Sequence, residues 1–108
     1  MTEVIEEEKI DFARLFKSKL QFDKPAQYQV IMMNDDFTPM DFVVDVLRKF
    51  FDMPEEKAIK VMSEVHLTGS AVCGVYPKDI AQTKAQKVMQ LARDNEYPLM
   101  CTVRSEQE

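Results

Sequence analysis

The sequence is poor in the residues from which many active sites are built: its 108 residues include two Gly, two Cys, one His and no Trp. Nucleotide-binding loops need several glycines within a few residues, whereas Gly69 and Gly74 are isolated. Zinc sites use clustered Cys and His, but His66, Cys73 and Cys101 show no paired spacing. We therefore expect no metal and no cofactor.

The sequence also has no long apolar run and no excess of basic residues. No stretch approaches the ~18 apolar residues of a membrane-spanning helix. The first ten residues, MTEVIEEEKI, are acidic where a secretory signal is basic and then apolar. The net charge of −5 argues against binding to nucleic acid or to an anionic membrane. We expect a cytoplasmic protein with a neutral or cationic partner.

Two cysteines are too few for a disulfide scaffold, so both are interpreted as reduced, half-buried core residues. A nucleophilic pair of Cys and His is possible on paper. However, Cys73 and Cys101 both lie in strand-like runs with apolar neighbours, which is typical of packing. The sequence thus indicates a protein that is not an enzyme.

The length fits one small domain at 25–108, preceded by an extension at 1–24. In the extension, Phe12, Leu15 and Phe16 have helical spacing, but no cap or glycine stop defines a helix. We predict a mobile N-terminal tail. It is either a solvated arm or a segment that another protein grips.

Six elements are predicted in the domain, in the order β-α-α-β-α-β. Strands separated by helices in so short a chain indicate an α+β fold, with a three-stranded antiparallel sheet packed on one face against three helices. The strands are predicted at 28–33, 70–76 and 99–103, and the helices from Thr38 to about Phe51, from Asp52 to Gly69 and from Pro77 to Ala92.

Local signals mark the helix ends. Thr38 is predicted to cap the first helix with its hydroxyl, with Pro39 at the first helical position. Asp52 and Glu55 have the spacing of a capping box, and Gly69 is the expected stop of the second helix. The predicted apolar stripe of the first helix is Met40, Val43, Val44, Leu47, Phe50 and Phe51.

A polar group, Asn34, Asp35, Asp36 and Thr38, lies between the first strand and the first helix. These residue types are typical of turns and caps, and carboxylates suit a helix N-terminus. Paired acids could also serve as a general acid and base or hold a hard metal, but no third ligand or nucleophile accompanies them. His66 alone is typical of a partly buried histidine beside an apolar stripe.

Three segments resemble the ClpS family, the adaptors of the ATP-dependent Clp protease. They are VIMMNDDFTPMDFVVDVLRKFF, KAIKVMSEVHLTGSAVCGVY and NEYPLMCTV. The motif NDDFTPM, an MxxVH on the second helix and a late PL before the last strand carry the resemblance, which covers about residues 25–104.

The resemblance implies an adaptor that binds proteins with a free N-terminal Leu, Phe, Tyr or Trp (an N-degron). It would deliver them to the ClpA unfoldase for degradation. It assigns Asn34, Asp35 and His66 to the substrate α-amino group. The pocket for the first side chain is assigned to Asp36, Thr38, Met40, Val43, Met62, Val65 and Leu99.

On the opposite side, Asp79 and Lys84 of the third helix resemble the face that docks on the N-terminal domain of ClpA. The family further implies a protein that is a monomer when free. The alternative from another class is a small regulatory subunit that controls an ATPase or enzyme without holding substrate. In that case residues 34–38 are only a turn.

Overall fold

The computed structural model describes residues 26–106. The extension at 1–24, predicted to be a mobile tail, lies outside this range. The predicted α+β class and element order are confirmed, and each element begins and ends within three residues of its expected place. The elements are β1 (Gln27–Met33), α2 (Met40–Phe50), α3 (Glu55–Thr68), β2 (Ser70–Pro77), α4 (Lys78–Asp94) and β3 (Met100–Ser105).

The sheet has the order β2-β1-β3, and both pairs are antiparallel, so β1 is the central strand. Val30 and Met32 of β1 are fully buried, because alternate residues of the central strand face the helices. The register shifts at Val30/Ile31, where Cys73 is an extra residue in β2. This bulge leaves both Val72 and Val75 on the other face of the sheet, where each is exposed.

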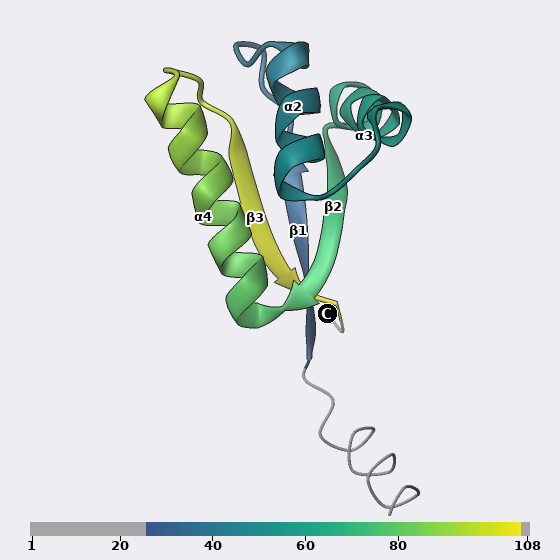
Figure 1. The fold of residues 1–108 in the computed structure, drawn as a ribbon, viewed down its shortest axis with the longest axis vertical. Coiled ribbons are helices and arrows are strands. Elements are labelled where there is room, and N and C mark those ends of the chain that lie inside the picture. Colours follow the sequence, from purple (N-terminus) through teal and green to yellow (C-terminus); the bar gives the residue numbers. More distant parts are fainter. Residues whose placement is uncertain (1–25, 107–108) are drawn as a thin grey trace, which may run out of the picture.

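The helices form one layer over the sheet, as expected (Figure 1). α4 contacts all three strands, while α3 packs on β2 and α2. α2 lies between α3 and α4 and contacts both. The most deeply buried side chains come from both layers: Val30 and Met32 of β1, Val46 and Leu47 of α2, and Ala58, Ala81, Val88 and Ala92 of α3 and α4.

Cys73 and Cys101 are free thiols in this core. They are fully buried, not half-buried as predicted, because both project from edge strands onto the face that the helices cover. Burial is the main cause that raises the pKa of each thiol to about 12. Both cysteines are therefore protonated at neutral pH and poor nucleophiles.

Two of the predicted helix caps are wrong. The N-cap of α2 is Pro39, with no side-chain cap, because the Thr38 hydroxyl donates a hydrogen bond backwards to Asp35 instead. The N-cap of α3 is Pro54, also without a side-chain cap. Asp52 instead has a left-handed φ of 53° and follows the end of α2.

The predicted stop of α3 is confirmed. Gly69 has a φ of 98°, a conformation that favours glycine, and its N–H donates to the carbonyl of Val65. The apolar stripe of α2 was predicted in part. Val46, which the stripe omitted, is almost fully buried, whereas Met40 is 50% exposed at the start of the helix.

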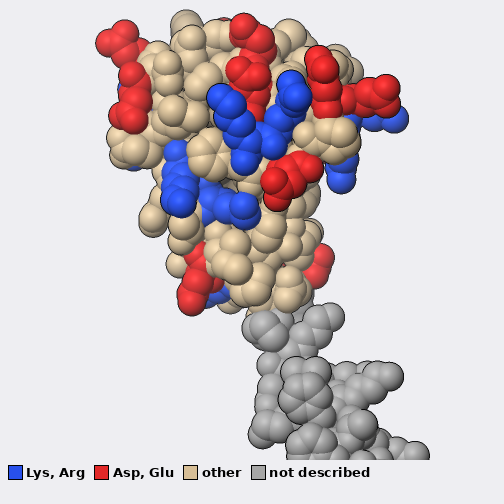
Figure 2. Space-filling view, viewed as in Figure 1, with Lys and Arg blue, Asp and Glu red and all other residues tan. Residues whose placement is uncertain are grey.

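Charge is distributed along α2 in the direction that suits its dipole, with Asp41 in the first turn and Arg48 and Lys49 in the last. Figure 2 shows acidic side chains at the upper end of the molecule and a group of basic side chains below them. Within residues 26–106, no helix is both long and apolar enough to cross a membrane.

Candidate functional site

The polar loop at 34–38 is fixed to the end of α3 by a backbone contact. The Asn34 N–H donates to the carbonyl of Gly69 at 2.9 Å. Met33, the last residue of β1, pairs with Ser70 of β2 in the sheet. Residues far apart in the sequence thus meet where β1 ends and β2 begins.

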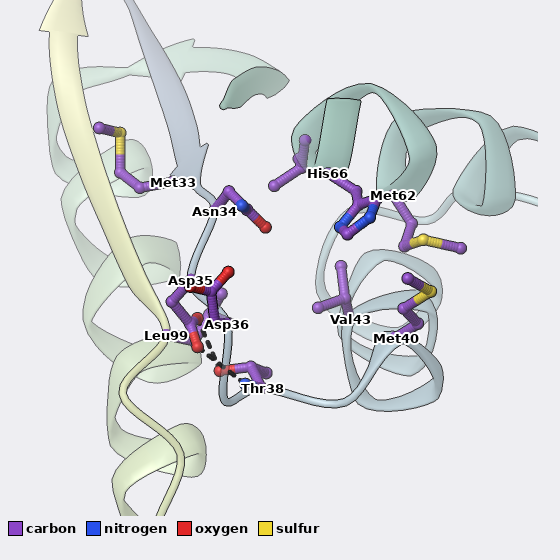
Figure 3. Close-up of a pocket in the computed structure, with 11 residues that line it drawn as sticks. Met33, Asn34, Asp35, Asp36, Thr38, Met40, Val43, Met62, His66 and Leu99 are labelled. Carbon is purple, nitrogen blue, oxygen red and sulfur yellow. Dashed lines mark hydrogen bonds between the residues drawn. The ribbon is translucent and has the colours of Figure 1, made fainter. Parts of the chain in front are cut away.

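His66 lies in the last turn of α3, three residues before this contact. Its side chain is exposed and points toward the cavity in which the Asn34 amide also ends (Figure 3). Neither side chain makes a hydrogen bond to another residue within 26–106. The interpretation of His66 as a partly buried histidine is therefore wrong, because its side chain is exposed.

The apolar wall of the site comes from three segments. Val43 is buried on α2, and Val65 is buried one residue before His66 on α3. Leu99, also buried, stands just before β3. Met40 and Met62 face each other across the side of the cavity that α2 and α3 form (Figure 3). Their thioethers are flexible and adapt to apolar groups of different shape.

These segments enclose a cavity of about 140 Å³. A cavity of about 150 Å³ in another protein holds benzene, so this one has room for a single aromatic ring or a branched aliphatic side chain. The ten residues that the resemblance assigns to substrate binding all line this cavity. Met33 lines it as well, although the sequence did not suggest it. The lining residues are Met33, Asn34, Asp35, Asp36, Thr38, Met40, Val43, Met62, Val65, His66 and Leu99.

The two aspartates of the loop differ in their hydrogen bonds. Asp35 is half-buried, and its Oδ1 accepts from the N–H groups of Phe37 at 2.8 Å and Thr38 at 2.7 Å. Its Oδ2 accepts from the Thr38 hydroxyl at 2.7 Å. Asp36 is exposed, and its side chain makes no hydrogen bond to another residue within 26–106.

The cavity therefore combines an apolar interior with hydrogen-bond acceptors at its rim. Among its lining residues are two aspartates and no Lys or Arg. The Asn34 amide oxygen, the Asp36 carboxylate and an unprotonated His66 nitrogen can each accept a hydrogen bond. Such a site suits an apolar group that carries a cationic donor beside it. Within 26–106, no three His, Cys, Asp or Glu residues are arranged to hold a metal ion.

The two residues predicted for docking lie elsewhere, on α4. Asp79 is exposed in its first turn. Lys84 is half-buried, and its Nζ donates to the carbonyl of Phe50 at 2.7 Å. The same ammonium lies 5.9 Å from the ring centre of Phe51 and 5.1 Å from that of Tyr76. Lys84 thus binds the C-terminal end of α2, where free carbonyls attract cations.

The fold is a single sheet with one helical layer, and it carries a small apolar pocket with hydrogen-bond acceptors at the rim. These features define a module that binds the apolar group of a ligand. A family model described as ATP-dependent Clp protease adaptor protein ClpS matches residues 23–102. The chain belongs to this family of adaptors.

Named relatives and one solved structure agree with this assignment. An ATP-dependent Clp protease adapter protein ClpS from Nitrosomonas eutropha is 51% identical over 90 residues, which are 83% of this chain and 87% of the relative. One from Salmonella arizonae is 47% identical over 96 residues, 87% and 91% of the two chains. The structure of Agrobacterium tumefaciens ClpS2 bound to L-phenylalaninamide has a TM-score of 0.75 and 42% identity. It covers 77% of this chain and 100% of that one.

Proposed function

We propose that this adaptor binds proteins through a free N-terminal Leu, Phe, Tyr or Trp and delivers them to the ClpA unfoldase for degradation. The observation that carries the proposal is the cavity of about 140 Å³ with Asn34, Asp36 and His66 at its rim. The relative bound to L-phenylalaninamide supports it, because that ligand has an aromatic ring next to a free amine.

The rim is suited to the α-amino group. An α-ammonium offers three N–H donors, so its site needs three acceptors. Asn34 and His66 supply two, and the carboxylates at 35 and 36 supply the third. Hydrogen bonds to a charged group contribute ~1.5–3 kcal/mol each. Acetylation removes the charge and two of the donors, so binding should depend on a free amine.

The interior is suited to the first side chain, which Thr38, Met40, Val43, Met62, Val65 and Leu99 would surround. Burial of a Leu or Phe side chain contributes a further ~1.5–3 kcal/mol. The gross sum with the amine bonds exceeds the ~8 kcal/mol of a micromolar complex, and the entropy of association offsets much of it. We expect micromolar or somewhat tighter binding.

Two anchors of different chemistry would give selectivity. An internal Leu has the apolar side chain but no free amine, whereas an N-terminal Ala or Ser has the amine but too little apolar surface. Only a bulky apolar residue at the first position satisfies both requirements.

Delivery requires a second contact, which we assign to the N-terminal domain of ClpA and to the exposed end of α4 that carries Asp79. Residues 1–24 would act in this step, outside the pocket, so their removal should leave peptide affinity unchanged. The proposed adaptor binds its substrates without altering them and works in the cytoplasm, where its substrates and the unfoldase meet.

A titration tests the first half of the proposal. A fluorescent peptide with N-terminal Leu should bind at micromolar concentration, while its acetylated twin and a peptide with N-terminal Ala should not. Equal binding of the Leu peptide and its acetylated twin would refute substrate capture and favour a regulatory subunit. For the second half, degradation of a Leu-tagged protein by ClpA and its peptidase should increase when the adaptor is added.

A further inference from the structure

The methionines within residues 26–106 differ widely in their exposure to solvent. Met32 and Met53 are buried in the core. Met40 and Met100 are 50% and 54% exposed, and Met33 is also exposed. Hydroperoxides oxidise the thioether of methionine to a sulfoxide. Because the oxidant must reach the sulfur, we expect the exposed methionines to react well before the buried ones.

Met40 is the exposed methionine that also forms an apolar wall of the pocket. It is the first residue of α2 and lines the cavity, where it faces the half-buried Met62 of α3 (Figure 3). Met33 also lines the cavity, but its side chain points away from the other labelled residues (Figure 3). Met100 does not line the cavity. At Met40, access for an oxidant thus coincides with contact to the apolar interior.

The reaction at Met40 adds one oxygen atom to its sulfur. The sulfur attacks the terminal oxygen of a hydroperoxide, so that an S=O bond forms and the O–O bond breaks. The proton of the transferred hydroxyl moves to the other oxygen, which leaves as an alcohol, or as water when the oxidant is hydrogen peroxide. The sulfur loses two electrons and the peroxide gains them. A polar sulfoxide then replaces the apolar thioether.

A sulfoxide at position 40 suits an apolar ligand poorly. Its oxygen is a strong hydrogen-bond acceptor, but no Lys or Arg lines the cavity to bind it, and the facing thioether of Met62 has no donor. The oxygen therefore depends on water for its hydrogen bonds. A Leu or Phe side chain that enters the pocket displaces this water, and a polar group that loses its hydrogen bonds is costly to bury. Oxidation should thus weaken the contact with the first side chain.

We propose that Met40 is an oxidative modification site, at which conversion to the sulfoxide by hydroperoxides lowers the affinity of the pocket for apolar N-terminal residues. Methionine sulfoxide reductases remove the oxygen at the expense of a thiol reductant, so the change is reversible. A bound side chain covers Met40, and an occupied adaptor should therefore oxidise more slowly there than a free one. This inference rests on the proposed function and concerns the regulation of the same pocket.

A time course of oxidation in the full chain tests the proposal. Wild-type protein is treated with dilute hydrogen peroxide, and mass spectrometry measures the sulfoxide at each methionine. Fluorescence anisotropy measures the affinity for the Leu peptide in the same samples. Affinity should fall about tenfold in step with the sulfoxide at Met40, as for other small changes in apolar pockets. Treatment with the two reductases, one for each sulfoxide epimer, and dithiothreitol should restore it.

Matched substitutions locate the effect. Met40→Leu and Met100→Leu each remove one exposed sulfur with little change of side-chain volume. Each variant is compared with its own untreated sample, so that an effect of the substitution itself cancels. We expect Met100→Leu to lose affinity on oxidation as the wild type does, while Met40→Leu loses little. In wild-type protein, saturating phenylalaninamide should slow oxidation several-fold at Met40 and leave the rate at Met100 unchanged.

Unchanged affinity in wild-type protein whose Met40 is fully oxidised would overturn the proposal, and so would an equal loss in Met40→Leu. If Met40→Leu does not bind the peptide, the wild-type time course decides: a loss that follows the sulfoxide at Met100 and not at Met40 would overturn it. Untreated wild-type protein that does not bind the Leu peptide would contradict the proposed function itself. Normal binding before oxidation, with no change after it, would contradict only this inference.

Discussion

The two ends of helix α2 differ in whether the polar groups near them have partners within the fold. At its C-terminal end, the Lys84 ammonium is bound to the Phe50 carbonyl and lies near two aromatic rings. Near its N-terminal end, the side chains of Asn34, Asp36 and His66 have no hydrogen-bonding partner within 26–106. A polar group satisfied inside the fold stabilises it, whereas unsatisfied groups around an apolar cavity are available to a ligand.

Both ends of α2 carry the charge that suits the helix dipole, so charge alone does not separate them. What separates them is the apolar cavity at one end. There a ligand amine can bind the free acceptors while its side chain displaces water from Val43 and Leu99. The following changes at each end test this contrast.

The largest effect is expected for His66→Ala, which removes a proposed acceptor for the ligand amine. Peptide affinity should fall about 10- to 100-fold, the equivalent of one hydrogen bond to a charged group. Lys60→Ala, at an exposed position of the same helix, is the matched control and should bind as the wild type does. Fluorescence anisotropy with the Leu peptide measures both. A wild-type peptide affinity in His66→Ala would show that His66 does not bind the ligand amine.

A smaller effect is expected for Met40→Ala at the mouth of the pocket. The Met40 side chain should crowd a branch at Cβ, so wild-type protein should bind N-terminal Val and Ile poorly. Shortening it should raise the affinity for Val about tenfold and change the affinity for Leu much less, as for other one- or two-methylene changes in pockets. If the variant still does not bind the peptide with N-terminal Val in the same assay, a group other than Met40 excludes side chains branched at Cβ.

Acidification should weaken binding by several-fold between pH 8 and pH 5. A protonated imidazole cannot accept a hydrogen bond from an ammonium and also repels it. Peptide affinity should therefore be highest at the higher pH. Peptide titrations at both pH values check this, and His66→Ala should show a much flatter profile. The same affinity at pH 5 and pH 8 in wild-type protein would contradict the role of His66.

The smallest effect is expected at the other end of α2. Lys84→Met removes the ammonium from the Phe50 carbonyl, so the free energy of unfolding should fall by about 1 kcal/mol. Peptide affinity should stay as in the wild type, since the pocket is at the opposite end. Urea unfolding of this variant and of Lys87→Met, an exposed control on α4, measures the difference. Equal stability of the two variants would show that the contact does not contribute.

The order of the elements was predictable from local signals, because apolar periodicity and Gly69 are properties of short segments. The cap at Thr38 was not. Its hydroxyl can either cap a helix or bond back to Asp35, and only the turn geometry decides between them. Asp52 likewise has the spacing of a capping box, yet its backbone is left-handed beyond the end of α2.

The site was predictable as a list of residues only through the family resemblance. Sequence spacing alone could not predict that His66 lies near Asn34, because the Asn34–Gly69 hydrogen bond that places them together is a tertiary contact. Met33 was missed because it reads as an ordinary strand residue. The signal that could have found it is its place beside Asn34 at the end of a central strand.

The central claim is that the pocket receives a free α-amine together with an apolar side chain. Calorimetric titration with three small ligands tests it most directly: phenylalaninamide, N-acetylphenylalaninamide and 3-phenylpropanamide. All three contain the same ring and carboxamide, and only the first has a free amine. We expect measurable binding of phenylalaninamide and none of the other two at the same concentrations. Comparable binding of 3-phenylpropanamide would show that the ring alone is recognised and would contradict the account.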